Sequence, residues 1–91
     1  MIVPRETIES AHLDSIRNKE SIKNSILCGC YFCLEIFPAD YVEEFLEESR
    51  GDSTALCPYC EIDSVIGDSK VSLSKELLEE LHKSWFGVIK L

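Results

Sequence analysis

The N-terminal segment is polar, with apolar residues at roughly helical intervals. Between Glu6 and Ser25 neither glycine nor proline interrupts the pattern. The apolar positions are Ile8, Ala11, Leu13, Ile16 and Ile22. This spacing predicts a weakly amphipathic helix over residues 6–25, broken near Asn18.

The pattern changes at Leu27, where glycine and cysteines lie within an apolar, aromatic run that ends at Phe37. That run predicts a strand, a tight turn and a second strand. Pro38 suits the first position of a helix, and the residues after it place one apolar stripe opposite an acidic face. The stripe is Tyr41, Val42, Phe45 and Leu46. We therefore expect an acidic helix over residues 38–48, ending in the glycine-containing segment 49–52.

The last third of the chain predicts short strands and a final helix. Residues 54–56 fit a short strand, whereas residues 61–68 fit either a strand or a single helical turn. Ser74 is a suitable N-cap, and Gly87 a suitable end, for a helix with four large apolar residues on one face. These four are Leu77, Leu78, Leu81 and Trp85.

A chain of 91 residues forms one small domain, because chains of this size rarely hold two hydrophobic cores. We expect a helical segment over residues 1–26, a cysteine-containing core with the inserted acidic helix over residues 27–68, and a C-terminal helix within residues 69–91. A core this small supplies little stability, so a metal, a disulfide or a partner is a common supplement.

The cysteines show which supplement to expect. Cys30 and Cys33 form one C-x-x-C pair, Cys57 and Cys60 form another, and 23 residues lie between the pairs. Each pair lets a tight turn aim two sulfurs at one point, so two turns complete a tetrahedral four-cysteine zinc site. Four thiolates leave no open coordination position, which is typical of structural zinc. The predicted fold is a small α+β zinc-binding domain of zinc-ribbon or treble-clef type, with two knuckles that form a structural pseudo-repeat.

Cysteines in such pairs also serve in other kinds of site. An iron–sulfur cluster also takes four cysteines, and the spacing does not separate iron from zinc. A thioredoxin-like redox pair needs a βαβ context and a longer chain. Cys28 is the spare thiol, expected to be buried or weakly reactive. His12 and His82 lack a ligand spacing to either pair and are expected to be surface or packing residues.

The net charge of −8 is concentrated in the middle of the chain. Residues 35–68 hold ten acidic residues against Arg50 alone, whereas the flanking segments are nearly neutral. Such a surface repels phosphate backbones and attracts basic surfaces, which disfavours nucleic acid as a partner. The sequence contains no apolar stretch of about 20 residues, no secretory signal and no nucleophile or phosphate-loop motif. We therefore expect a cytoplasmic protein that is neither a membrane protein nor an enzyme.

Two stretches carry a resemblance to a known family. At Cys28-Gly-Cys-Tyr-Phe-Cys-Leu-Glu-Ile-Phe-Pro and Ala55-Leu-Cys-Pro-Tyr-Cys-Glu-Ile-Asp-Ser-Val-Ile-Gly the sequence resembles small bacterial cytoplasmic proteins of zinc-ribbon type. The similarity extends through residues 11–13 and 81–86. It implies a zinc-stabilised binding module with the four paired cysteines as ligands. Glu61 departs from the glycine expected after the second knuckle, which questions the turn geometry there.

The same resemblance implies a role, because some members of the family lie beside polymorphic toxins as immunity proteins. A nuclease or an ADP-ribosyltransferase binds phosphates in a basic cleft, which an acidic protein can cover. The expected contacts with such a protein partner are Asp40, Glu43, Glu44, Glu47, Glu48, Asp63 and Asp68. The alternative is a zinc-ribbon adaptor or regulator that binds the transcription or translation machinery or nucleic acid. A small metal-dependent enzyme is a third hypothesis.

Overall fold

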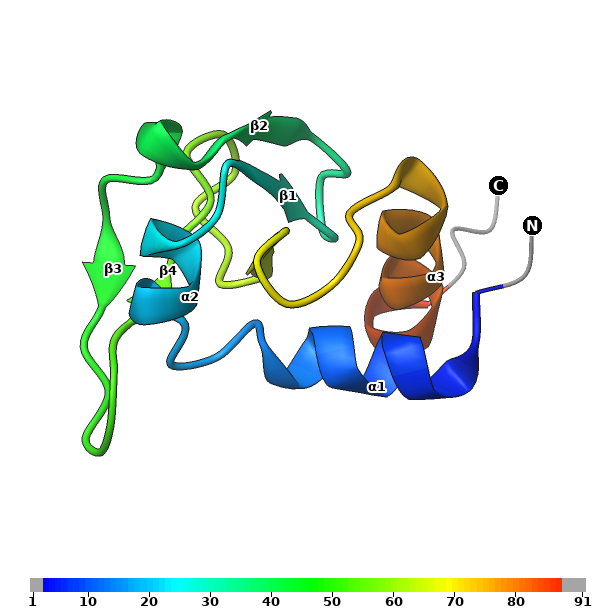
Figure 1. Ribbon diagram of the computed structural model, residues 1–91, viewed down its shortest axis with the longest axis horizontal. Helices are drawn as coiled ribbons and strands as arrows, with labels where there is room; N and C mark the ends of the chain where they lie inside the picture. Colours follow the sequence, from blue (N-terminus) through cyan, green and yellow to red (C-terminus); the bar gives the residue numbers. More distant parts are fainter. Residues whose placement is uncertain (1–2, 88–91) are drawn as a thin grey trace.

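The computed structural model describes residues 3–87, so residues 1–2 and 88–91 of the expected domain lie outside the described part. Figure 1 shows how the helices and strands follow one another along the chain. In order they are α1 (Arg5–Leu13), α2 (Lys19–Lys23), β1 (Leu27–Cys30), β2 (Ile36–Pro38), the 3-10 turn η1 (Ala39–Tyr41), β3 (Phe45–Leu46), β4 (Thr54–Ala55), β5 (Val65–Gly67) and α3 (Lys75–Phe86). The predicted α+β class is confirmed.

A three-stranded sheet divides the hydrophobic core. Its order is β2-β1-β5, antiparallel throughout, with Cys28 opposite both Phe37 and Gly67. Successive side chains of a strand point to opposite faces, so the sheet buries a different cluster on each face. The metal-side cluster contains Ile22, Cys28, Cys30, Phe37, Val42, Ala55, Cys57 and Val65. The helix-side cluster contains Ala11, Tyr31, Ile66, Leu77, Leu78 and Leu81.

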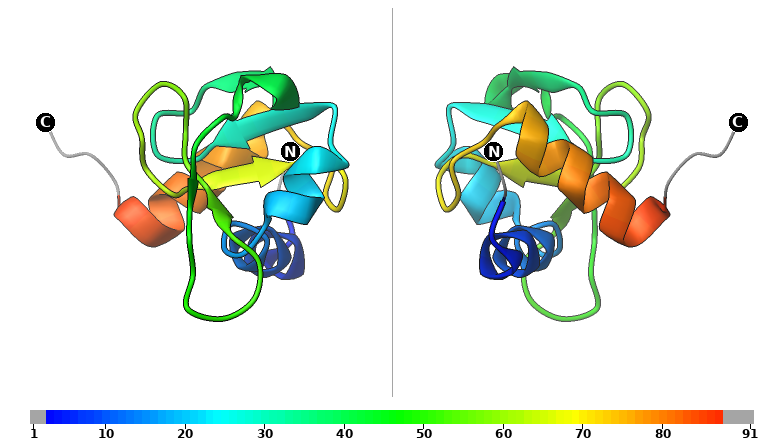
Figure 2. Two further views of the ribbon diagram at one scale, coloured as in Figure 1. Left: turned by 90° about the vertical axis from the view of Figure 1, so that its left-hand side faces the viewer. Right: turned by 90° about the vertical axis from the view of Figure 1, so that its right-hand side faces the viewer.

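Helix α3 lies across the sheet on the helix side (Figure 2) and has the predicted ends. The Ser74 hydroxyl accepts a hydrogen bond from the Leu77 N–H at 3.1 Å, and Gly87 has a positive φ of 79°. Gly29 in β1 makes the close packing possible, because an added Cβ would lie 2.9 Å from Leu78 Cδ1. The glycine between two buried cysteines therefore lets α3 pack closely without displacing the Leu78 side chain.

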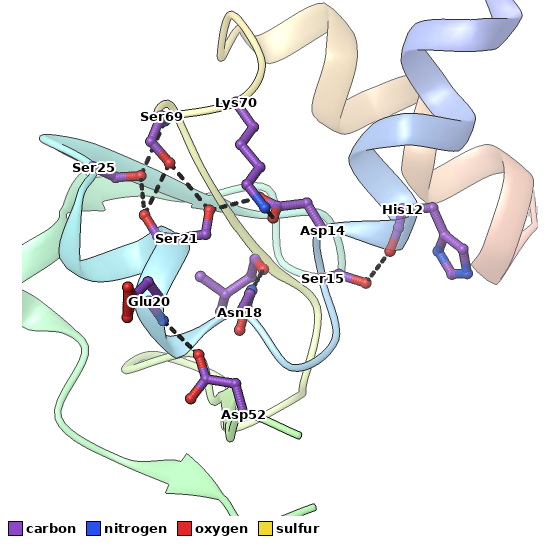
Figure 3. Close-up of polar contacts among 11 residues, drawn as sticks. His12, Asp14, Ser15, Asn18, Glu20, Ser21, Ser25, Asp52, Ser69 and Lys70 are labelled. Atoms are coloured by element: carbon purple, nitrogen blue, oxygen red, sulfur yellow. Dashed lines mark hydrogen bonds and ion pairs between the residues drawn. The ribbon is translucent and has the colours of Figure 1, made fainter. Parts of the chain in front are cut away.

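The N-terminal helical segment breaks where the sequence predicts, between Leu13 and Lys19. Asn18 is almost fully buried there and joins two strands. Its side-chain amide donates to the Val65 carbonyl at 2.7 Å, and its side-chain oxygen accepts from the Ala55 N–H at 2.9 Å. Figure 3 shows Asn18 among the polar side chains of this segment. The break therefore serves to connect β4 and β5 to the helical segment.

The expected acidic helix over residues 38–48 is wrong. Only the short turn η1 follows Pro38, and the chain then runs extended into β3, which pairs with β4. Two facts explain the difference. Glutamates at positions 43 and 47, and at 44 and 48, would place like charges four residues apart on a helix. Buried Val42 and half-buried Phe45 instead pack on the metal-side cluster, and Phe45 pairs with Ala55.

Strand β5 resolves the alternatives left open for residues 61–68, since Val65–Gly67 are a buried strand. Among residues 3–87, no helix is both long enough and apolar enough to cross a lipid bilayer.

Candidate metal centre

The first cysteine pair forms a knuckle at the end of β1. The Leu34 N–H donates to the Cys30 carbonyl at 2.8 Å, and the Cys30 N–H donates to the Glu35 carbonyl at 3.0 Å. The Phe32 N–H points at Cys30 Sγ, 3.4 Å away. Leu34 closes the turn in the left-handed region, with a φ of 67°. The turn thus brings both cysteine side chains to one side.

The second pair repeats this arrangement group by group. The Glu61 N–H donates to the Cys57 carbonyl at 2.9 Å, and the Cys57 N–H donates to the Ile62 carbonyl at 3.0 Å. The Tyr59 N–H lies 3.4 Å from Cys57 Sγ, and Glu61 has a φ of 66°. The predicted pseudo-repeat is confirmed, and Glu61 adopts the backbone conformation for which glycine is expected.

The two knuckles face each other and bring four sulfurs together. Each residue of the set Cys30, Cys33, Cys57 and Cys60 offers one Sγ, and these atoms all lie within 4.8 Å of one another. Cys30 Sγ is 3.7 Å from Cys60 Sγ, and Cys33 Sγ is 3.7 Å from Cys57 Sγ. A disulfide needs about 2.05 Å, so these are thiols. The four sulfurs are therefore a candidate metal site.

The spacing of the sulfurs fits a tetrahedral ion of the size of zinc. Zn–S bonds of about 2.3 Å place the corners of a tetrahedron about 3.8 Å apart. Two of the sulfur pairs, at 3.7 Å, match that edge, and all the pairs lie within 4.8 Å. Cys30 and Cys57 are buried, whereas Cys33 and Cys60 are half-buried, so the site lies at the edge of the metal-side cluster.

The pKa values of the cysteine thiols show that burial disfavours the thiolate form, which a bound cation would stabilise. Burial raises the pKa of Cys30, and it raises the pKa of Cys60 to about 11. Burial acts in the same direction at Cys57, but the N–H groups of Cys60 and Tyr59 outweigh it and lower its pKa. Because metal ligation needs thiolates, a divalent cation would stabilise charges that burial disfavours, and binding would release protons.

The spare cysteine and the two histidines lie outside this set. Cys28 is fully buried, and burial, together with Asp68 and Asp14, raises its pKa to about 12. His82 Nδ1 lies 3.0 Å from the Tyr31 carbonyl, as a hydrogen-bonding partner next to the first knuckle. His12 stacks on Trp85 with ring centroids 3.7 Å apart. Both histidines are packing residues, and Cys28 is buried, as the sequence predicts.

The acidic residues expected to contact a partner fall into two groups. Five are exposed, namely Asp40, Glu43, Glu44, Glu47 and Asp63. The other two accept hydrogen bonds within the fold. Glu48 accepts from the Thr54 hydroxyl at 2.6 Å, and Asp68 accepts from the Ile26 N–H at 2.9 Å. Glu48 and Asp68 therefore have structural roles.

Residues 43–55, here called the acidic hairpin, contain β3, β4 and the loop between them. Asp52, at the end of this loop, accepts hydrogen bonds from the Glu20 N–H at 2.7 Å and the Ser53 N–H at 2.9 Å. The bond from Glu20 is the main reason that the pKa of Asp52 is lowered. Figure 3 shows Asp52 reaching the first turn of α2. The hairpin is thus joined to the rest of the domain at its loop as well as at Ala55.

One pocket was missed by the sequence analysis. It has a volume of about 300 Å³ and lies between the end of α1, the first knuckle and the end of α3. Tyr31, Asp63 and Trp85 line it, and each comes from a different part of the chain. No local spacing relates these residues, so the sequence pattern gives no signal for the pocket.

No family model matches the chain, and comparisons with curated proteins and with solved structures likewise find no match.

Proposed function

We propose that the protein is a non-enzymatic binding module, stabilised by one structural zinc ion, whose acidic hairpin binds a protein partner with a basic surface. The observation that carries the proposal is the position of the carboxylates. Glu43, Glu44 and Glu47 are exposed on an extended ribbon that is held at its loop and at Ala55, and Asp40 is exposed just before it.

The four-cysteine site supports a structural, non-catalytic role for the metal in this proposal. Four cysteines would fill the coordination sphere of zinc and leave no position for a substrate or a reactive water. In such a module the ion holds the knuckles together, and the charged surface binds the partner.

The partner class that fits is a toxin domain with a basic, phosphate-binding cleft, such as a nuclease or an ADP-ribosyltransferase. Covering the cleft would inhibit the toxin, which makes the protein an immunity protein. Opposite charges would speed association, and the effect would weaken as salt screens it. A net charge of −8 also disfavours nucleic acid as the partner.

Native mass spectrometry of the tagged protein, isolated from its own cells, tests both parts of the proposal in one spectrum. We expect one zinc ion and one basic protein partner whose own activity is inhibited in the complex. The charge-reversed variant Glu43→Lys, Glu44→Lys, Glu47→Lys should lose that partner.

The matched control reverses three exposed acids on the helices, Glu6→Lys, Glu76→Lys and Glu79→Lys, and has the same net charge. It should keep the partner. Equal loss of the partner in both variants would mean that partner binding depends on the net charge and not on the acidic hairpin. Isolation with nucleic acid, or with no partner, would contradict the proposal.

A further inference from the structure

The pocket between α1 and α3 is built around a fixed aromatic side chain. Tyr31 is 3% exposed, and its hydroxyl lies 3.1 Å from both His12 Nδ1 and Ser15 Oγ. Ser15 Oγ in turn donates to the His12 carbonyl at 2.6 Å, as seen at the end of α1 in Figure 3. These polar groups bind one another, so the pocket wall is ordered without a ligand.

The rim of this pocket exposes large apolar side chains together. Leu13 is 71% exposed, Ile16 44%, Trp85 41% and Phe86 42%. All four line the pocket. Apolar residues that are exposed singly are ordinary, but a group around a cavity marks a binding surface.

Asp63 is the charged residue of the lining, and it is exposed. No lysine or arginine lines the pocket, and within residues 3–87 no salt bridge reaches Asp63. A carboxylate beside aromatic rings favours a cation, because the ring faces and the carboxylate both attract positive charge. The net charge of −8 acts in the same direction.

The size of the pocket limits the cation to a single side chain or a small molecule. About 300 Å³ is at the lower end of ligand pockets and does not accommodate a helix or a strand. A guanidinium group fits better than an ammonium group, because it is planar, stacks on aromatic rings and can give two parallel hydrogen bonds to a carboxylate.

We propose that this pocket binds an arginine side chain of the protein partner, with the guanidinium group packed against the aromatic lining of the pocket and paired with the Asp63 carboxylate. The inference rests on the proposed function, because it supplies an anchor for the basic partner beyond the acidic hairpin. The partner would then contact two separate sites. The acidic hairpin would bind it through charge alone, and the pocket would bind it through charge and aromatic packing.

The test uses a small probe and needs no identified partner. Nα-acetyl-arginine methylamide is titrated into the zinc-loaded protein, and backbone amide shifts are followed by NMR. Shifts should occur at residues around Tyr31, Asp63 and Trp85. The citrulline analogue has nearly the same shape without the charge, and it should bind at least about tenfold more weakly.

Two variants separate the contributions to binding. Asp63→Asn should weaken the arginine probe roughly fivefold, as expected for an exposed ion pair, and Phe86→Ala should weaken it while the spectrum stays folded. The control Glu43→Gln should leave the affinity unchanged. Equal binding of the arginine and citrulline probes, or no binding at all, would overturn the inference.

The two proposals fail in different ways. If charge reversal in the acidic hairpin removes the partner but the arginine probe does not bind, the hairpin proposal stands and the pocket proposal is wrong. If the probe binds and depends on Asp63, but no basic partner is found, the pocket proposal stands alone.

Discussion

Replacing one ligand, Cys60→Ser, should unfold most of the domain at temperatures where the wild type is stable. Structural zinc supplies about 10–16 kcal/mol of folding free energy at neutral pH in small zinc domains. A domain of this size has a total stability of only about 5–14 kcal/mol. Stability without the ion is therefore expected to be close to zero.

The location of the site explains why the loss spreads through the fold. Cys30 and Cys57 are part of the metal-side cluster; Cys30 is the last residue of β1, and Cys57 follows β4 by two residues. If the four ligands contribute equally, one is worth about 2.5–4 kcal/mol. For about 90 residues this corresponds to a fall in melting temperature of about 13–21 °C.

Circular dichroism during heating measures the melting temperature, and native mass spectrometry measures the bound metal. A chelator added to the wild type removes the whole ion and should produce a larger fall than Cys60→Ser. The control is Cys28→Ala, which changes a fully buried cysteine outside the site; it should keep one zinc ion and lose only about 1 kcal/mol. Visible absorption in the purified protein would indicate an iron–sulfur cluster in place of zinc.

The reasoning would be refuted by a Cys60→Ser protein that melts within about 3 °C of the wild type, a difference of less than 1 kcal/mol. It would also be refuted if the wild type bound no metal and were equally stable.

Three further predictions follow from single residues. Glu61→Gly should raise the free energy of unfolding by about 0.5–1 kcal/mol, because Glu61 is exposed and has a positive φ. Leu34 also has a positive φ, but Leu34→Gly should lower the free energy of unfolding because the packing of a half-buried side chain is lost. Urea unfolding measures both changes. Asn18→Ala should cost about 2–4 kcal/mol by leaving the Val65 carbonyl and the Ala55 N–H unpaired, whereas exposed Asn24→Ala should cost under about 0.5 kcal/mol in the same assay. Cys28 is fully buried, and burial raises its pKa to about 12, so iodoacetamide should leave it unmodified until the protein unfolds; rapid native labelling would contradict its burial.

Local signals were enough to predict the ends of several elements and the two cysteine knuckles of the candidate metal site. Ser74 and Gly87 mark a helix through their own hydrogen bonds and backbone angle, and the C-x-x-C spacing determines a turn within a few residues. The break near Asn18 was also correct, since a polar residue interrupts the apolar spacing there. Each of these features depends on neighbours in sequence.

The errors concern residues whose structure depends on distant segments. Residues 38–48 have a helical apolar stripe, but Phe45 pairs with Ala55 and packs on the metal-side cluster. Glu48, which is expected at a partner interface, also accepts a hydrogen bond from Thr54 that the sequence pattern does not indicate. A period of 3.6 residues cannot show that a pairing strand exists elsewhere in the chain, so tertiary contacts decided the structure of residues 38–48.

Strand β4 connects the acidic hairpin to the second knuckle of the candidate metal site. Strand β4 ends at Ala55, two residues before Cys57, and Ala55 is also held by Asn18. Closure of the second knuckle therefore fixes the chain directly after β4, in addition to the contacts of Asn18 and Asp52 with the hairpin. Exposed glutamates on a loose segment would retain their charge but lose the preorganisation that limits the entropic cost of binding. A partner that recognises the hairpin should thus distinguish the metal-loaded protein from the metal-free chain, although both carry the same carboxylates.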